Sequence, residues 1–335
     1  MLQSLKRMSV TAAWLSVGWF SPVLAMQNLA IALENSGEAI AQETAPEAPA
    51  EAMEETNDSA GASETSEEVN VAEICAPPEE INREELLPEG SENISSWINR
   101  AEYLITKKQY PQALSAYYQA IALEENNSQA WIGCGTVLQE MEEYDRAIVA
   151  LNQALKINPN SSMALLTRGL IYKQAERDEE ALADFENALE ADLNWGEEDQ
   201  SNAAINLGSV LWRLDKRSEA IAAFEQATEL NDQFALAWFN LGTAFLQQAS
   251  ILLQEQETEA AKTPLEQAIA AYDQALESQG EWGTNTGPAS AWYNRGVALE
   301  LLEKYEEAME SYDQALRITP NHTKARQRFA RLRDR

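Results

Sequence analysis

Small residues recur at a spacing of 34 along the second part of this 335-residue chain. The same interval separates Gly135 from Gly169 and Gly208 from Gly242, and Ala101 precedes Gly135 by that interval too. A fixed period of 20 to 50 residues is typical of chains that stack copies of one small structural unit. The spacing therefore predicts a repeat architecture, which constrains the fold more than any other feature of the sequence.

Alanine occupies two further places in every period once a 14-residue insertion is skipped, as Ala113 and Ala120 do in the first. A large side chain stands between the two alanines: Tyr117, Leu151, Phe185, Phe224, Tyr272 and Tyr312. Residues three or four apart share a helix face, so small residues on one helix leave room for large ones on its partner. Such close packing explains why glycine is used although it costs about 1 kcal/mol in a helix.

The pattern resembles the tetratricopeptide repeat, which has an early Trp, then Leu-Gly and Tyr, and later Ala, an aromatic residue, Ala and Pro. The Trp position holds Trp97, Trp131, Trp238 and Trp292, and the terminal proline is present as Pro159 and Pro320. The resemblance implies an all-α fold, a right-handed α-solenoid of about six helix–turn–helix units. We assign the repeats to residues 94–127, 128–161, 162–195, 201–234, 235–282 and 289–322.

A basic helix is expected to close the array over residues 323–335. Ala325, Phe329 and Leu332 would form its apolar stripe against the sixth repeat. Its basic residues are expected to face outward: Lys324, Arg326, Arg328, Arg331, Arg333 and Arg335. Two interpretations stay open, a solubilising end cap and an electrostatic dock for the acidic segment, a partner or anionic lipid.

The N-terminus has the pattern of an export signal. Lys6 and Arg7 precede an apolar run over residues 10–20, and residues 23–25 resemble a signal-peptidase site. We predict a signal peptide over residues 1–25; the alternatives are an uncleaved anchor reaching to about residue 33 and a cytoplasmic amphipathic start. Export would place the protein in a periplasm, a thylakoid lumen or the extracellular space, and only an anchor would hold it to a membrane.

Residues 26–93 carry 18 acidic residues against Arg83 alone. The segment is rich in Glu, Ala, Pro, Ser and Thr, and chains of that composition do not bury enough apolar surface to fold. We predict a disordered acidic linker that acts as a tether, with recognition of basic partners as the alternative. The net charge of the whole chain, −31, argues against a nucleic-acid partner.

The sequence lacks the usual parts of an active site. No HExxH, GxSxG or GxxxxGK[ST] motif is present, and His322 is the single histidine. We therefore expect neither an enzyme nor a cofactor or metal. Cys134 is interpreted as a small buried apolar residue; whether it pairs with Cys75, and whether the chain forms homo-oligomers, is left open.

Proteins that resemble this repeat bind peptides or proteins in a concave groove lined by the first helix of each repeat. Transferred to this chain, the groove would be apolar with a row of amides. The candidate residues are Ile98, Asn99, Ile132, Leu166, Ile205, Asn206, Phe239, Asn240, Tyr293 and Asn294. The asparagines are either ligand contacts or a structural habit of the family. We expect that replacing Phe239 and Tyr293 with Glu would abolish partner capture without unfolding.

Irregularities give secondary surface candidates. Trp195 and Trp282 stand in the same register, each before an insertion, and would cover bent joints unless they merely fill loop space. In the insertion at residues 248–261, Ile251, Leu252 and Leu253 would form an exposed apolar knob or pack the longer turn. Thr263 and Pro264 are expected to start the second helix of that repeat, because proline favours the first helical position.

Together these features predict a non-enzymatic scaffold or adaptor that is exported and binds a peptide segment or protein in its groove. Two alternatives remain. One is a self-associating assembly factor for a membrane or envelope complex, and the other is an accessory module that positions a polymer substrate.

Overall fold

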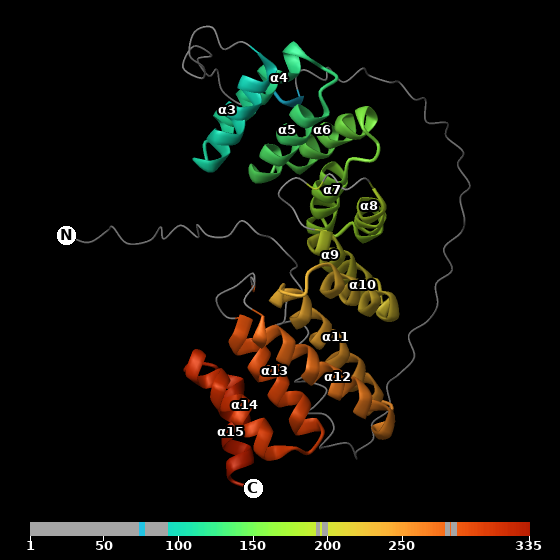
Figure 1. Cartoon of the computed structure of the whole chain (residues 1–335), viewed down its shortest axis with the longest axis vertical. Helices are drawn as coiled ribbons and strands as arrows, with labels where there is room; N and C mark the ends of the chain where they lie inside the picture. The colour runs from blue at the N-terminus through green and yellow to red at the C-terminus, as the bar shows by residue number, and fades with distance from the viewer. Residues whose placement is uncertain (1–73, 78–92, 192–194, 196–199, 279–281, 283–286) are drawn as a thin grey trace, which may run out of the picture. The chain divides into compact units, whose positions relative to one another are not determined.

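The computed structural model describes residues 74–77, 93–191, 195, 200–278, 282 and 287–335, and its helices are labelled in Figure 1. These residues form 13 α-helices and no strand. Contacts divide the chain into two compact units within helix α6. We call the described residues up to Ala150 the N-terminal unit and those from Leu151 onward the C-terminal unit. The predicted signal peptide and nearly all of the predicted linker lie outside the described residues.

The N-terminal unit consists of helix pairs. Its helices are α3 (Ile94–Thr106), α4 (Tyr110–Leu123), α5 (Ser128–Glu140) and the first half of α6 (Tyr144–Ile157). Asn93 and Asn127 cap α3 and α5, each accepting a hydrogen bond from a backbone N–H three residues later, at 2.8 and 3.0 Å. The first helices of the two repeats, α3 and α5, contact each other, as do α4 and α5.

The C-terminal unit continues the same alternation of helices. It contains α7 (Ser162–Gln174), α8 (Asp178–Glu190), α9 (Gln200–Arg213), α10 (Arg217–Leu230), α11 (Ala235–Gln254), α12 (Thr258–Glu277), α13 (Gly287–Leu301), α14 (Tyr305–Ile318) and α15 (Thr323–Arg333). Each second helix packs against its own first helix and against the next first helix, as in α7–α8–α9 and α11–α12–α13. Neighbouring repeats therefore supply each other's core, as expected of a stacked array. No helix among the described residues is long and apolar enough to cross a membrane.

The turn between the two helices of a repeat has the same conformation throughout the described chain. One non-glycine residue in each turn has a positive φ of 57° to 64°: Lys108, Glu142, Glu176, Asp215, Gln256 and Glu303. The next residue donates its N–H to a carbonyl of the preceding helix, for example Lys304 to Leu299 at 2.9 Å. This bond closes the helix end and satisfies a terminal carbonyl. A common turn fixes the angle at which each second helix returns.

The recurrent glycines lie against the large residue of their own repeat, as the sequence pattern predicts. A Cβ added at Gly169 or Gly208 would lie 2.8 or 2.6 Å from the ring of Phe185 or Phe224. The same holds in the last repeat, where a Cβ at Gly296 would lie 2.6 Å from Tyr312. Glycine is thus required by the close approach of two helices, and it is part of the scaffold.

The predicted start of the second helix in the fifth repeat is wrong. Helix α12 begins at Thr258, so Pro264 lies inside it. Helices α11 and α12 each have 20 residues, against 13 in α5 and α7, and the positive-φ residue Gln256 lies midway between them. The insertion therefore adds about two turns to each helix. The two long helices pack against each other along this hairpin (Figure 1), which offsets the backbone hydrogen bond that proline lacks.

The C-terminal helix α15 caps the array, but not all of its basic residues face outward. Ala325 and Leu332 are buried, whereas Phe329 is half-buried. Arg328 is largely buried and donates to Oε2 of Glu300 on α13 at 3.0 Å; Arg331 pairs with the same carboxylate, which also accepts from the Tyr312 hydroxyl at 2.7 Å. Burial would raise the pKa of Glu300, but these partners outweigh it and lower the pKa. The expectation is corrected for Arg328, which locks the cap to the sixth repeat.

Candidate partner-binding surface

The candidate groove residues of the C-terminal unit are all buried. Their side chains belong to the first helices α7, α9, α11 and α13: Leu166, Ile205, Asn206, Phe239, Asn240, Tyr293 and Asn294. Their exposed fractions range from 0% at Ile205 to 7% at Phe239. In this conformation their side chains cannot contact a partner. Their assignment as partner contacts stays a prediction.

Aromatic contacts explain why Phe239 and Tyr293 are buried. The ring of Phe239 lies 5.9 Å from Tyr272 of its own repeat and 6.3 Å from Trp282, and Tyr293 lies 5.9 Å from Tyr312 and 4.8 Å from His322. Rings at these separations stabilise a core beyond their buried area. The burial of both contradicts the expectation that Glu at these positions would leave the fold intact, because a buried unpaired charge is strongly destabilising.

Two asparagines of the row, Asn206 and Asn294, form hydrogen bonds within the chain. Asn206 donates to the carbonyl of Asn202 at 2.8 Å and accepts from the Lys173 ammonium at 2.6 Å. Asn294 hydrogen-bonds with the Tyr272 hydroxyl of the preceding repeat. Asn240 is buried as well, and its Nδ2 has no hydrogen-bond partner. At two of these positions the amide links neighbouring repeats, which favours the structural interpretation of the motif.

Lys173 on α7 is a buried cation that the sequence did not reveal. Its Nζ contacts Asn206 on α9, and its carbonyl accepts from Arg213, which also pairs with Asp178. Burial, reinforced by the charge of Arg213, lowers the pKa of Lys173 to about 7. Through its contact with Asn206, the amine joins two neighbouring repeats.

The N-terminal unit keeps part of its candidate surface accessible. Ile98 is buried, but Asn99 is exposed and Ile132 is half-buried, and they lie on the contacting first helices α3 and α5. Glu102 is exposed on the same helix as Asn99 and accepts from Gln129 at 3.4 Å across the two helices. Tyr103 has 52% of its surface exposed. We call Asn99, Glu102, Gln129 and Ile132 the α3–α5 face, and it combines amide, carboxylate and apolar groups.

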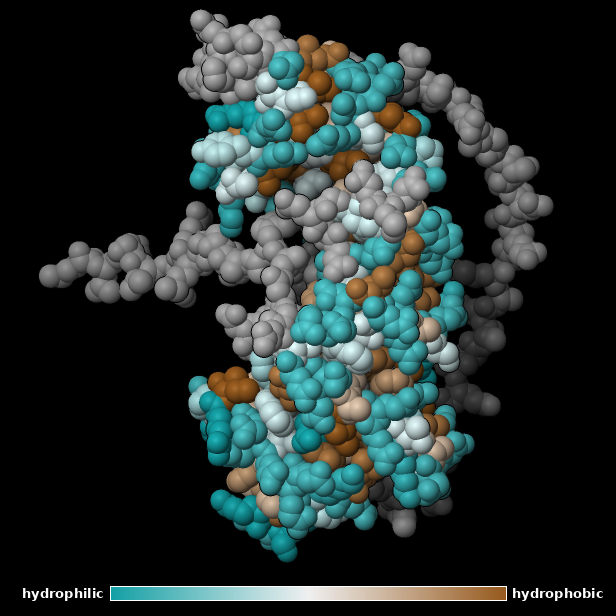
Figure 2. Space-filling model, viewed as in Figure 1, coloured by the Kyte–Doolittle hydropathy of each residue, from teal (hydrophilic) through white to brown (hydrophobic). Residues whose placement is uncertain are grey.

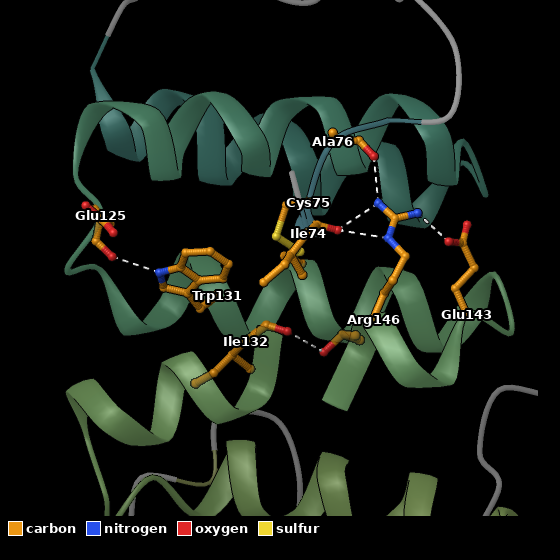
Figure 3. Close-up of a disulfide and its surroundings, with 10 residues drawn as sticks. Ile74, Cys75, Ala76, Glu125, Trp131, Ile132, Glu143 and Arg146 are labelled. Atoms are coloured by element: carbon orange, nitrogen blue, oxygen red, sulfur yellow. Dashed lines mark hydrogen bonds and ion pairs between the residues drawn. A yellow bond between two sulfur atoms is a disulfide. The ribbon is translucent and has the colours of Figure 1, made fainter. Parts of the chain in front are cut away.

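A disulfide ties the acidic segment to this unit, and sequence reasoning left that pairing open. Cys75 and Cys134 are bonded, with exposed fractions of 1% and 0% (Figure 3). Cys134 is buried as expected, but it is a covalent partner and not merely a small apolar residue. Arg146 on α6 donates to the carbonyls of Ile74 and Ala76. Neither contact has a signal in the sequence beyond the presence of two cysteines.

The secondary candidates are buried or half-buried, although an exposed knob was one expectation for residues 251–253. Trp195 is buried, and Trp282 is half-buried beside Gly287, whose added Cβ would lie 2.5 Å from the indole. The insertion residues 251–253 are half-buried on the extended part of α11. Within the C-terminal unit, Figure 2 shows hydrophobic residues as separate patches between hydrophilic ones on the viewed face. The structure does not show an apolar knob, and a contact role for these residues stays a prediction.

No group of three His, Cys, Asp or Glu side chains able to hold a metal ion occurs among the described residues.

A surface cleft in the C-terminal unit is lined by Leu155, Pro159, Asn160, Leu165, Arg168, Asn187, Glu190 and Ala191. Arg168 of this lining forms an ion pair with Asp184 at 2.5 Å and donates a hydrogen bond to Asn152. The guanidinium is therefore engaged within the chain, and the other charged residue of the lining, Glu190, is exposed.

Comparison with known families gives four matches, all described as tetratricopeptide repeat. They cover residues 104–169, 161–233, 205–262 and 289–322, together more than half of the chain. The chain is a tetratricopeptide repeat protein. The match at 289–322 has the bounds that we assigned to the sixth repeat from the sequence. Among curated proteins, none matches this sequence significantly.

Solved structures show the tetratricopeptide fold as well. PilF of Pseudomonas aeruginosa is 18% identical with a TM-score of 0.54, over 71% of this chain and 97% of that protein. A chain of the APC/C Cut9–Hcn1 hetero-tetramer is 19% identical with a TM-score of 0.51, over 79% of this chain and 46% of that one. YrrB, described as having an unusual peptide-binding site, is 26% identical with a TM-score of 0.49, over 63% and 96%. At their identities, the likeness to PilF and to the Cut9–Hcn1 chain shows the fold alone, an all-α solenoid of tetratricopeptide repeats.

Proteins built from tetratricopeptide repeats are in general non-enzymatic interaction modules, and the fold of this chain supports a protein–protein interaction scaffold.

Proposed function

We propose that this protein is a scaffold or adaptor that binds a peptide segment of a partner on the α3–α5 face of its N-terminal unit. The observation that carries the proposal is the difference in exposure between candidate residues. Asn99 and Ile132 are accessible on two contacting helices, whereas the corresponding side chains of the C-terminal unit are buried. An exposed amide can hydrogen-bond a peptide backbone, and Ile132 offers apolar area beside it.

The binding test uses the full chain. Peptides are selected from a displayed random library on the purified protein, and the affinity of a selected peptide is then measured for single variants by calorimetry. We expect Ile132→Glu and Asn99→Ala to weaken binding by tenfold or more, since about 1.4 kcal/mol corresponds to a factor of ten. Ala222→Glu, at an exposed position on α10, is the matched control. Unchanged affinity in both α3–α5 variants would refute the assignment.

We further propose that the protein is exported. Two observations support this: the charged and apolar pattern of residues 1–25, and the buried Cys75–Cys134 disulfide, since structural disulfides persist mainly in oxidising compartments. In a secretion-competent bacterium expressing the full gene, we expect the protein outside the cytoplasm, with a mass that corresponds to cleavage after Ala25. A cytoplasmic product with both thiols free would contradict the proposal, and an exported product of full mass would identify an anchor.

A further inference from the structure

Residues Ile74–Pro77, which we call the strap, are bound to helices α5 and α6 of the N-terminal unit. The side chain of Ile74 has 6% of its surface exposed and that of Cys75 has 1%, while Ala76 and Pro77 are half-buried. The strap precedes α3 in the sequence, yet its disulfide reaches α5 of the second repeat. Its covalent bond is therefore to the second helix pair after it in the sequence, α5 and α6, and not to the first.

Arg146 recognises the backbone of the strap. Its Nε and Nη2 donate to the carbonyl of Ile74 at 3.1 and 2.7 Å, and Nη2 also donates to the carbonyl of Ala76 at 2.7 Å. Glu143 holds the other side of the guanidinium, as Figure 3 shows. Ile74 is helical and Cys75 lies in a turn, so the two carbonyls lie at and just after a helix end, where carbonyl groups have no partner within the helix. A fixed guanidinium fork supplies them through charge-assisted hydrogen bonds.

We propose that the N-terminal unit contains a peptide site for the strap and that the Cys75–Cys134 disulfide is its redox latch. A dithiol reductant opens the latch: its two thiols become one disulfide, and Cys75 and Cys134 each gain one electron and one proton to become thiols. The strap then loses its covalent bond to α5, so that the hydrogen bonds from Arg146 and the burial of its residues are left to hold it, and it can leave. Oxidation closes the latch by the reverse exchange.

The burial of both sulfur atoms makes the latch dependent on Arg146. A reductant thiolate must reach a sulfur atom, and neither is accessible while the strap is in place. The strap therefore has to lift before the exchange begins. Because Arg146 supplies the polar contacts that oppose lifting, its side chain sets the rate at which the disulfide is reduced.

The first test measures that rate in the full oxidised chain. Dithiothreitol is added, and free thiols are trapped with an alkylating reagent at successive times and counted by mass spectrometry. We expect Arg146→Ala to speed reduction on the order of tenfold, given the strength of hydrogen bonds to charged groups. Arg146→Lys, which keeps the charge without the fork, should fall in between. Arg177→Ala, which removes an exposed arginine paired with Glu180, should match wild type.

Equal reduction rates in wild type and both Arg146 variants would overturn the proposal. Circular dichroism separates faster reduction of a folded chain from loss of the fold: a faster rate supports the proposal only where the helical signal equals that of wild type. If Arg146→Ala is unfolded, Arg146→Lys carries the test.

The second test asks whether the site accepts the strap as a separate peptide. The full chain with Ile74→Asp and Cys75→Ser is mixed with a synthetic peptide of residues 72–79, AEICAPPE, and oxidised glutathione. Peptide thiol and Cys134 thiol lose two electrons and two protons and form a mixed disulfide, as oxidised glutathione becomes two reduced molecules. We expect several-fold more adduct than with a scrambled peptide, and loss of that preference in Arg146→Ala. Equal adduct with both peptides in the unmodified Arg146 background would overturn the proposal.

Discussion

Helices α5 and α11 carry two copies of the same hexapeptide, AWIGCG and AWFNLG, and use them differently. In both, the Trp indole donates to a carbonyl six residues earlier: Trp131 to Glu125 at 2.7 Å and Trp238 to Asp232 at 2.9 Å. The residues between Trp and Gly diverge. In α11 all three are buried, and Phe239 packs on aromatic rings. In α5 Ile132 and Gly133 are only partly buried, and Cys134 is bonded to the strap.

The variable residues of a repeat therefore do not always form a surface for a partner. In the C-terminal unit, Phe239 packs within its own repeat, and Asn206 contacts Lys173 of the preceding repeat. In the N-terminal unit, Gly133 is half-buried, and Cys134 forms a disulfide with Cys75 of the strap. The scaffold positions are the same in both units; what the intervening residues contact depends on their size and on what lies beside them.

The largest effect should come from the first variable position. Phe239→Ala removes a ring packed against Tyr272 and Trp282, and we expect a loss of about 4 kcal/mol in the free energy of unfolding. Ile132→Ala, at the same position of α5, should cost only about 1 kcal/mol, because its side chain is half-exposed. Urea titration followed by circular dichroism measures both. Similar losses in the two variants would remove the distinction between the helices.

The disulfide should stabilise one unit only. Cys75→Ser with Cys134→Ser opens a loop of 59 residues, and we expect the N-terminal unit to lose about 3 kcal/mol. Hydrogen exchange read by mass spectrometry resolves the two units: amides of α3 and α5 should exchange faster, and those of α11 and α13 should not change. Equally faster hydrogen exchange in both units would show that the disulfide stabilises the whole chain.

Much of the fold could be predicted from the sequence because its determinants are local and repeated. The positions of Gly, Ala and the large residue predicted helix pairs, and the structure places Gly208 against Phe224 as that pattern requires. The start of α12 was misjudged because proline is common at the first helical turn, and the pattern does not show how an insertion is shared between two helices.

The candidate site was less predictable because it depends on exposure and on contacts distant in sequence. Nothing in the sequence distinguishes a Phe239 that faces a groove from one that packs on Tyr272. The hydrogen bonds from Arg146 to the carbonyls of Ile74 and Ala76 join residues 72 and 70 positions apart, and the Cys75–Cys134 disulfide joins residues 59 positions apart. None of these contacts has a periodic signal. Periodicity reports on the scaffold, whereas such contacts depend on the three-dimensional arrangement of residues that do not repeat.

A smaller effect tests the part of the hexapeptide that both helices share. Gly242→Leu places a side chain where an added Cβ would already lie 2.9 Å from the Tyr272 ring and 3.2 Å from the Ala268 carbonyl oxygen. We expect a loss of about 2 kcal/mol from overpacking. Ala222→Leu, on the exposed side of α10, is the control and should change stability little. Thermal unfolding followed at 222 nm measures both; an unaltered melt of Gly242→Leu would mean that the glycine is not needed for close packing.

The smallest effect concerns helix caps, where the two units also differ. Asn127 caps α5, whereas α15 is capped by His322, whose Nδ1 accepts from the Ala325 N–H at 3.2 Å. Burial, together with the charge of Lys324, lowers the pKa of His322. The neutral ring of His322 caps the helix. Its contribution to the stability of the fold is therefore complete above the unfolded pKa of about 6.5 and is lost as the pH falls through the lower folded pKa.

His322→Asn keeps a good cap and removes the titration, so the variant and wild type should diverge as the pH falls from 7.5 to 5. We expect wild type to lose up to about 1 kcal/mol more than the variant, the size of one helix cap. Urea midpoints at several pH values measure this difference. The many carboxylates titrate alike in both chains and cancel, so parallel pH curves would show that the His322 cap does not respond to pH.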